Sequence, residues 1–296
     1  MKSARPHPAW APWFFLGPFL VFFAAFVAWP LARSLVLSLE QSYGPRVAVF
    51  IGLRNFSFLL RDPLFWTALR NTVLFTAGSL VVQMPVALGL ALLLNRPALK
   101  GRAWFRLLFF SPSLVGMVFA GVIFALIFEK RTGLINYSLH ALFHHWDPDF
   151  PWLENYVMTS LVLAALWLYA GFNMVYFLAA LQNVPDEQIE AASIDGASAW
   201  QRFWHVTLPA IRPVGSFVVL LSISGSLQLF ALPYLIFYLT WGSGPDNRAL
   251  TLVTYLYRTG FLSGDLGYAC TIGWVLTLLL VGVALVQMRF LGGEDV

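Results

Sequence analysis

Six long stretches without a single charged side chain limit what this chain can fold into. Each stretch holds at least 22 residues. About 20 predominantly apolar residues form a helix that crosses the ~30 Å hydrocarbon core of a bilayer, and only helices or closed barrels satisfy their backbone groups there. We therefore expect an all-α, polytopic membrane protein in a single domain, residues 1–296. The predicted transmembrane spans are approximately 10–32, 71–95, 107–128, 156–181, 214–239 and 267–288.

The composition agrees with a chain that lies mostly in lipid. Only 11% of the residues are charged, whereas an average soluble domain is about one quarter charged. The 18 basic and 14 acidic side chains are too few to cover a soluble protein of 296 residues. The net charge of +4 suits a protein near anionic lipid headgroups and gives no reason to expect a nucleic-acid partner. Its single cysteine, Cys270, excludes an internal disulfide.

The loop charges indicate the orientation. An even number of spans places both termini on one side of the membrane. Basic residues are divided almost evenly between the two sets of loops, but the short segment 96–106, RPALKGRAWFR, is the densest in positive charge. Short, dense basic loops remain in the cytoplasm. We therefore expect an inner-membrane protein whose N- and C-termini are cytoplasmic.

The segment 185–213, PDEQIEAASIDGASAWQRFWHVTLPAIRP, differs from every other loop. Pro185 precedes good helix formers with two carboxylates in the first turn. Gly196 stands where a helix would end in a left-handed conformation. An aromatic amphipathic stretch follows, and we expect Pro209 and Pro213 to end it. Two short helices joined by a glycine turn would form a docking element for a partner protein, although a helix pair lying on the membrane surface shows the same pattern.

The spacing of this segment resembles a known motif. It has Glu-Ala-Ala at 190–192, Gly196 after three intervening residues, and a Val-x-Leu-Pro ending at Pro209. This spacing resembles the EAA loop of the permease subunits of ABC importers, with valine at a position where isoleucine is commoner. The resemblance implies that the loop sits in a cleft of an ATPase subunit and transmits its closure to the spans. The coupling residues that it implies are Glu190, Ala191, Ala192, Asp195, Gly196, Leu208 and Pro209.

The resemblance extends over most of the chain. Residues 50–72, 171–198 and 241–261 look like segments of sugar permeases of the maltose and glycerol-phosphate type, although Ser243 replaces a glycine in the last of them. This similarity implies the type I permease fold of ABC importers. It also implies four partners, which are an ATP-binding subunit dimer, a second similar permease chain that makes a heterodimer, an extracytoplasmic solute-binding protein and membrane lipid.

The chain itself carries no motif for catalysis. A G-x-x-x-x-G-K-[ST] phosphate loop is absent from the sequence, so ATP must be hydrolysed by another chain. We therefore expect a transporter subunit rather than an enzyme, with no catalytic residue and no cofactor of its own, while partner subunits bind ATP and Mg²⁺. The histidines between 140 and 145, with Asp147 and Asp149, could form a metal site, but we interpret this segment as an interfacial helix and predict no metal.

Uncharged polar residues within the spans are candidates for a substrate pathway. Such residues are costly against lipid, so they face other helices or a water-filled path. The segment 222–230, SISGSLQLF, offers room and hydrogen-bond partners, and nearby aromatic rings could stack on a sugar, which favours a neutral carbohydrate. The predicted pathway residues are Asn173, Tyr176, Ser222, Ser224 and Gln228.

Two other functions fit parts of the sequence. An ion-coupled secondary transporter commonly places an ionisable group within the membrane, and the six predicted spans have none in their apolar stretches, although backbone carbonyls could hold sodium. An ABC permease for a non-sugar solute, such as glycerol phosphate or a polyamine, would share the EAA loop. Both alternatives remain open on the sequence alone.

Overall fold

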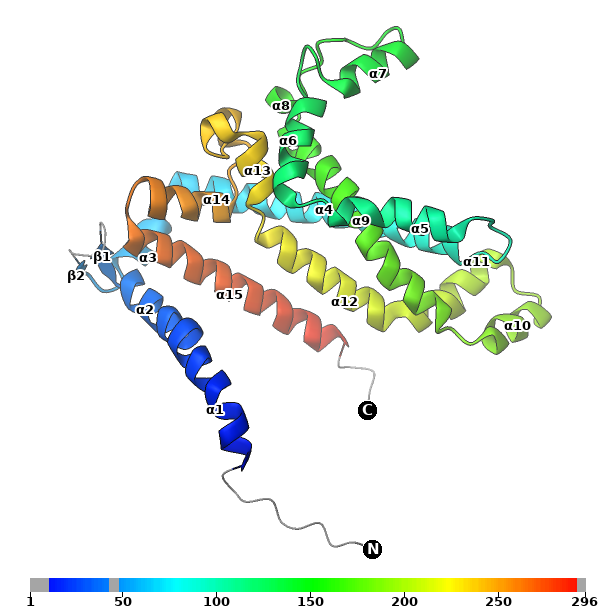
Figure 1. Ribbon diagram of the computed structural model, residues 1–296, viewed down its shortest axis with the longest axis horizontal. Coiled ribbons are helices and arrows are strands. Elements are labelled where there is room, and N and C mark those ends of the chain that lie inside the picture. Colours follow the sequence, from blue (N-terminus) through cyan, green and yellow to red (C-terminus); the bar gives the residue numbers. More distant parts are fainter. Residues whose placement is uncertain (1–10, 43–47, 292–296) are drawn as a thin grey trace, which may run out of the picture. The chain divides into compact units, whose positions relative to one another are not determined.

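The computed structural model describes residues 11–42 and 48–291. It is mostly helical, with one antiparallel hairpin in which Glu40 pairs with Phe50. Residue 10, the predicted start of the first span, and both chain ends lie outside the described residues. The elements, labelled in Figure 1, are α1 (Ala11–Phe23), α2 (Trp29–Ser38), β1 (Glu40–Ser42), β2 (Ala48–Phe50), α3 (Arg54–Leu59), α4 (Pro63–Asn95), α5 (Arg102–Phe110), α6 (Met117–Ile127), α7 (Leu134–Leu142), α8 (Trp152–Asn155), α9 (Val157–Gln182), α10 (Asp186–Ile194), α11 (Ala199–Arg202), α12 (Leu208–Leu227), α13 (Ala231–Ile236), α14 (Leu252–Tyr257) and α15 (Leu266–Leu291).

Five helices among the described residues are long and apolar enough to cross a membrane, and a bent helix pair makes a sixth candidate span. This result confirms the all-α polytopic prediction. The five helices are Trp13–Ser38, Pro63–Asn95, Val157–Gln182, Ala199–Ile236 and Leu266–Arg289. The second begins eight residues before its predicted start at residue 71, because Asp62 caps α4 by accepting a hydrogen bond from the backbone N–H of Leu64.

The prediction of one unbroken helix over 107–128 is wrong. Residues 102–114 and 117–127 form two helical arms that meet at an angle of 97° (Figure 1). Between them, Pro112 lies in a tight 3₁₀ turn and Val115 is extended, with ψ of 122°. Proline supplies no N–H to continue an α-helix, so the carbonyls before it need other donors. Two serines provide them, because Ser111 Oγ donates to the carbonyl of Leu108 at 3.0 Å and Ser113 Oγ donates to that of Phe110 at 2.7 Å.

The prediction that Pro209 and Pro213 end a helix is also wrong. Helical backbone continues without a break from Ala199 to Leu227. A π turn over Phe203–Thr207 precedes Pro209, and in it the N–H of Leu208 bonds to the carbonyl of Phe203. This wider turn shifts the carbonyls away from the proline ring, which would collide with them in a regular α-helix. The predicted start of the fifth span, residue 214, therefore lies in the middle of a helix that begins in the loop, at Ala199.

The chain divides into two compact units, and the smaller comprises residues 1–61 and 256–275. In it, the amide of Asn55 donates two hydrogen bonds of 3.0 Å to the carbonyls of Ser38 and Glu40. The start of α15 lies against the same strand, where a β-carbon at Gly267 would come within 2.1 Å of the Glu40 carbonyl oxygen. Only glycine permits this approach.

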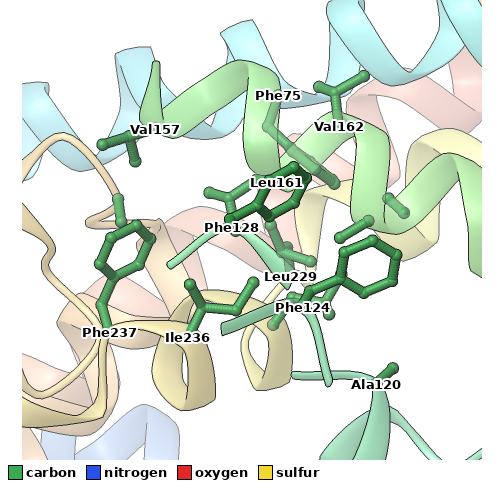
Figure 2. Packing of buried hydrophobic residues seen from close by; sticks show 14 of the residues in the cluster. Phe75, Ala120, Phe124, Phe128, Val157, Leu161, Val162, Leu229, Ile236 and Phe237 are labelled. Atoms are coloured by element: carbon green, nitrogen blue, oxygen red, sulfur yellow. The ribbon is translucent and has the colours of Figure 1, made fainter. Parts of the chain in front are cut away.

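The larger unit, residues 62–255 and 276–296, is built around the long parallel pair α4 and α9. One apolar cluster, shown in Figure 2, packs Phe75 and Leu161 from these helices against Phe128, Leu229 and Ile236. A second cluster lies further along the same helices. It contains Ala87, Ala91, Leu94, Met174, Phe177, Leu178, Ala180, Leu181, Val184, Ile211 and Val218.

The helix bend at Pro112 is held against α9 by a glycine. A β-carbon at Gly171 would lie 1.7 Å from the backbone oxygen of Phe109, which is shorter than any van der Waals contact. The backbone of α5 therefore lies directly on α9 at this point. Side-chain packing alone does not permit so close an approach, so Gly171 fixes where the bent arm crosses the central helix.

Candidate functional site

The loop 185–213 begins with α10, whose end is built as the sequence predicts. Gly196 has a φ of +81°. Its N–H bonds to the carbonyl of Ser193, and the N–H of Ala197 bonds to that of Ala192, at 3.2 and 3.0 Å. These two bonds form a Schellman motif, which satisfies carbonyls at a helix end and requires a left-handed residue. Space around Gly196 is open, so the backbone conformation rather than crowding selects glycine here.

The second helix of the loop starts only two residues later, at a complete capping box. Ser198 Oγ accepts from the N–H of Gln201 at 3.3 Å, and Gln201 Oε1 accepts from the N–H of Ser198 at 2.8 Å. This reciprocal pair satisfies two backbone donors at the helix start. The turn between α10 and α11 is therefore short and defined at both ends.

An arginine of the second helix ties it back to the first. Arg202 Nη1 donates to Ser193 Oγ at 2.9 Å and to the carbonyl of Ala197 at 3.1 Å. Ser193 Oγ in turn donates to the carbonyl of Ile189 at 2.8 Å. We call these three bonds the Arg202 clasp. It joins α10, the glycine turn and α11, and so fixes the angle between the two helices.

The loop is anchored on the large unit by apolar contacts. Ile189 of α10 and Leu208 of α12 pack against the second cluster, which includes Val184 and Ile211. The opposite side of the loop exposes large apolar groups, with Ile194 86% and Trp200 69% exposed. Exposed groups of this size on an ordered element indicate a surface that contacts another protein or the membrane. The aromatic rings of Trp200, Phe203 and Trp204 pack together beside it, with Trp204 edge-on to the other two.

The structure places most of the predicted coupling residues on this exposed side. Glu190, Ala191 and Asp195 are exposed. A small hollow of about 280 Å³ opens at the glycine turn, and it brings some of the predicted residues together with the clasp arginine. Leu208 and Pro209 do not reach it and line a different groove along α12. The residues lining the hollow are Ala192, Asp195, Gly196, Ala197, Gln201, Arg202, His205 and Val206.

The predicted pathway residues lie on neighbouring faces of α9 and α12. Asn173 is buried, and its Nδ2 is 3.5 Å from Ser222 Oγ across the two helices. Tyr176 lies edge-on to Phe217, with ring centroids 6.1 Å apart. Ser224 and Gln228 are joined locally, because Gln228 Nε2 donates to the carbonyl of Ser224. Asn173 and Ser222 therefore form one polar contact, while Gln228 is exposed one turn further along.

Other polar residues of the spans join helices to loops. Asn71 Nδ2 donates to the carbonyls of Asn247 and Leu250, at 2.8 and 3.0 Å. Thr72 Oγ1 accepts from the N–H of Leu252. Both residues are buried. They hold the loop before α14 on α4 and show no sign of lining a path.

Sequence reasoning missed the Arg202 clasp and the capping box. The capping box has a readable signature, since serine followed three residues later by glutamine is a known helix-start pattern. The clasp has none, because nothing in the spacing of Ser193 and Arg202 shows that the turn brings them within 2.9 Å.

The histidine segment is ordered by backbone contacts. His140 Nδ1 lies 2.9 Å from the carbonyl of Trp146, and Asn136 binds the carbonyls of Lys130 and Phe150. Within residues 11–42 and 48–291, no group of three or more histidine, cysteine or acidic side chains is placed to hold a metal ion.

Comparison with known sequences gives a consistent result. Residues 83–291 match the family model described as the binding-protein-dependent transport system inner membrane component. The chain is 39% identical over 285 residues to an arabinooligosaccharides transport system permease protein of Bacillus subtilis (strain 168), covering 95% of this chain and 88% of that one. It is 35% identical over 279 residues to a lactose transport system permease protein of Rhizobium radiobacter, covering 93% and 92%.

One further sequence relative and one solved structure are also similar to this chain. An sn-glycerol-3-phosphate transport system permease protein of Rhizobium meliloti (strain 1021) is 31% identical over 281 residues, covering 94% of each chain. Among solved structures, a chain of a bacterial alginate ABC transporter in complex with alginate pentasaccharide-bound periplasmic protein superposes with a TM-score of 0.81. That match has 22% identity and covers 97% of this chain and 96% of that one, so it shows the fold.

Proposed function

Because the chain belongs to the family of binding-protein-dependent transport system inner membrane components, we propose that this ABC importer permease subunit carries a carbohydrate across the cytoplasmic membrane. The observation that supports the solute class is the similarity along nearly the whole chain to permeases for arabinooligosaccharides and lactose. The polar contact between Asn173 and Ser222 supports a path between α9 and α12.

The coupling surface is the exposed side of the loop 185–213. An ATP-binding subunit contacts Glu190, Ala191, Asp195 and the exposed Ile194 and Trp200. Closure of the ATPase dimer then moves α10 and α11 together, because the Arg202 clasp joins them. Nucleotide acts by binding one global state better than the other, which shifts the spans between inward- and outward-facing forms. ATP and Mg²⁺ are bound by the ATPase subunits, and this chain needs no cofactor.

One chain offers one docking loop, whereas the ATPase acts as a dimer. The proposed importer therefore contains a second, similar permease chain as a heterodimer partner, together with an extracytoplasmic solute-binding protein. The loop 185–213 and both termini face the cytoplasm, in keeping with the basic segment 96–106.

A second solute class has support of its own. The 31% identity to a permease for sn-glycerol-3-phosphate makes glycerol phosphate the alternative cargo. Binding of each solute to the cognate solute-binding protein, measured by thermal shift, separates the two. A shift with glycerol phosphate and none with oligosaccharides would contradict the carbohydrate assignment.

Two glycines test the docking role, since each has a left-handed φ and open space around it. Gly196 lies in the loop 185–213, and Gly101 precedes α5 with φ of +78°. A side chain in this conformation costs about 1–2 kcal/mol at either position. Gly196→Trp therefore differs from Gly101→Trp chiefly by its position on the docking surface.

We expect Gly196→Trp to abolish co-purification of the ATPase subunit and ATP-driven uptake in vesicles, and Gly101→Trp to retain both. Equal behaviour of the two variants contradicts the docking role of the loop. Uptake driven by an ion gradient without the ATPase subunit would contradict the importer mechanism and support a secondary transporter.

A further inference from the structure

A long apolar groove lies within the larger unit, bordered by α4, α9, α12 and the second half of α15. Its volume is about 1110 Å³. On α12 the lining residues recur every three or four positions, from Arg212 through Ser216 and Val219 to Ile223, and so form one helix face. The facing side of α15 includes Gly282. No residue of the predicted sugar path lines this groove.

The two ends of the groove differ in polarity. Arg212 lies at one end, exposed, and one helical turn later the carbonyl of Ser216 accepts a hydrogen bond from Gln287 Nε2. The other amide atom, Gln287 Oε1, is buried and has no hydrogen-bond partner among the described residues. Towards Ile223 and Leu278 the lining is aliphatic. The cationic Arg212 and the unpaired acceptor Gln287 Oε1 therefore lie at one end of an otherwise apolar groove.

The length of the groove matches one leaflet of a bilayer. Arg212 and Ile223 are separated by about 16 Å along α12, at 1.5 Å per residue. This distance is about half of the ~30 Å hydrocarbon core. Arg212 itself belongs to the loop 185–213, which the proposed function places in the cytoplasm, so the polar end is at the depth of the cytoplasmic headgroups.

We propose that the groove binds one anionic glycerophospholipid of the cytoplasmic leaflet, with its phosphate at Arg212 and an acyl chain running along Gly282 and Val219. Arginine forms charge-assisted hydrogen bonds to phosphate, and the cytoplasmic leaflet is the source of anionic lipid. A headgroup hydroxyl donates to Gln287 Oε1, which pairs the buried acceptor. A carbohydrate is a poor occupant, because its hydroxyls would lose their hydrogen bonds against aliphatic walls.

Photolabelling of the complete transporter tests this site. The transporter is reconstituted in phosphatidylcholine vesicles that contain a phosphatidylglycerol with a diazirine on its acyl chain. After irradiation, labelled peptides are identified by mass spectrometry. We expect label in residues 215–223 of α12 and 278–286 of α15, and little label when the probe is the matching phosphatidylcholine.

Matched variants test the two halves of the site. Gly282→Phe puts a ring into the groove and should lower labelling of these peptides roughly tenfold, whereas Gly282→Ala, whose β-carbon meets open space, should retain it. Arg212→Gln should lower labelling by the phosphatidylglycerol probe roughly tenfold, equivalent to about 1.4 kcal/mol. Arg106→Gln removes a charge from exposed α5 and should have no effect.

Two results would overturn the proposal. Equal labelling by both probes, unchanged in Arg212→Gln, would show that no headgroup site exists. Absence of label from both helices in the complete transporter would show that another chain, such as the second permease, covers the groove. Labelling needs neither ATP nor solute, so it is independent of the proposed transport. If the groove is not labelled but ATP-driven uptake is observed, only the lipid site is contradicted. If the groove is labelled but no ATP-driven uptake is observed, only the proposed function is contradicted.

Discussion

Two proline-containing helices of this protein behave in opposite ways. Residues 102–127 bend by 97° at Pro112, whereas the run from Ala199 to Leu227 passes Pro209 and Pro213 without a break. The difference lies in how the backbone replaces the missing N–H. Before Pro209 a π turn keeps the carbonyls bonded, whereas Pro112 lies in a 3₁₀ turn that is followed by an extended Val115, so the α-helix ends there.

The two outcomes suit different tasks. The bend lets α5 lie across α9, where Gly171, having no side chain, leaves room for the backbone of α5. The unbroken run carries the proposed docking loop at one end and the pathway candidate Ser222 at the other. A continuous helix transmits displacement along its axis better than a hinged one, so the run links the proposed coupling surface to the proposed path.

The largest effect is expected at the contact that holds the bend. Gly171→Leu would drive a side chain into the Phe109 carbonyl, which cannot move without displacing α5. We expect a loss of about 3 kcal/mol or more, seen as a lower thermal unfolding temperature and lower yield in detergent. Gly89→Leu is the control, because Gly89 on α4 has open space. Equal destabilisation by both changes would show that the bend does not depend on this contact.

The next effect concerns the start of the straight run. Arg202→Ala removes two hydrogen bonds that join α11 to α10 and the turn. We expect ATP-driven uptake per ATP hydrolysed to fall several-fold, while the helix content, measured by circular dichroism, stays unchanged. Stability should fall by only about 1 kcal/mol, because the clasp is partly exposed.

The matched control for the clasp is Arg106→Ala, which removes an arginine outside the loop 185–213. It should leave the ratio of uptake to hydrolysis intact. If Arg202→Ala also preserves that ratio, the clasp has no part in coupling.

A smaller effect distinguishes the serines at the bend from a serine in a regular helix. Ser113→Ala leaves the Phe110 carbonyl without its donor and should cost about 1 kcal/mol in the free energy of unfolding. Ser34→Ala removes a similar bond to the Leu31 carbonyl within the helix Trp13–Ser38, where removal should cost less. Denaturant titration of both variants measures the difference, and identical losses would argue against a special role for the bend serines.

The smallest effect is a pH dependence at the end of the bent pair. Hydrogen bonds to Glu129 from the backbone N–H and the hydroxyl of Thr132 lower the pKa of its carboxyl below 4.5. A depressed pKa contributes stability that is present above 4.5 and is lost as the pH falls through the lower, folded value. The protection of the amides of Arg131 and Thr132 against hydrogen exchange, relative to unstructured amides at the same pH, should therefore fall below pH 4.5. In Glu129→Gln this protection should already be lower at neutral pH, and unchanged protection would contradict the assignment.

Much of the fold was predictable from local chemistry. The charge-free windows predicted the apolar spans because charged groups are costly in hydrocarbon, and Gly196 predicted the left-handed helix end because few other residues adopt that conformation. The effect of each proline on its helix was not predictable, since the sequence around Pro112 and Pro209 does not show which of them is preceded by a π turn. The spacing of the EAA-like residues was readable for the same reason, as it is a property of neighbouring residues.

By itself, then, the sequence determined that most of the chain lies in lipid, the number of candidate spans and the limits of the segment proposed to dock, all of which depend on residues near one another in the chain. Only the tertiary structure decided the bend on Gly171, the Arg202 clasp and the groove between α12 and α15. These features join residues from different helices or across a turn. Their geometry depends on how closely two backbones approach, which the packing of the whole unit fixes and a local pattern does not record.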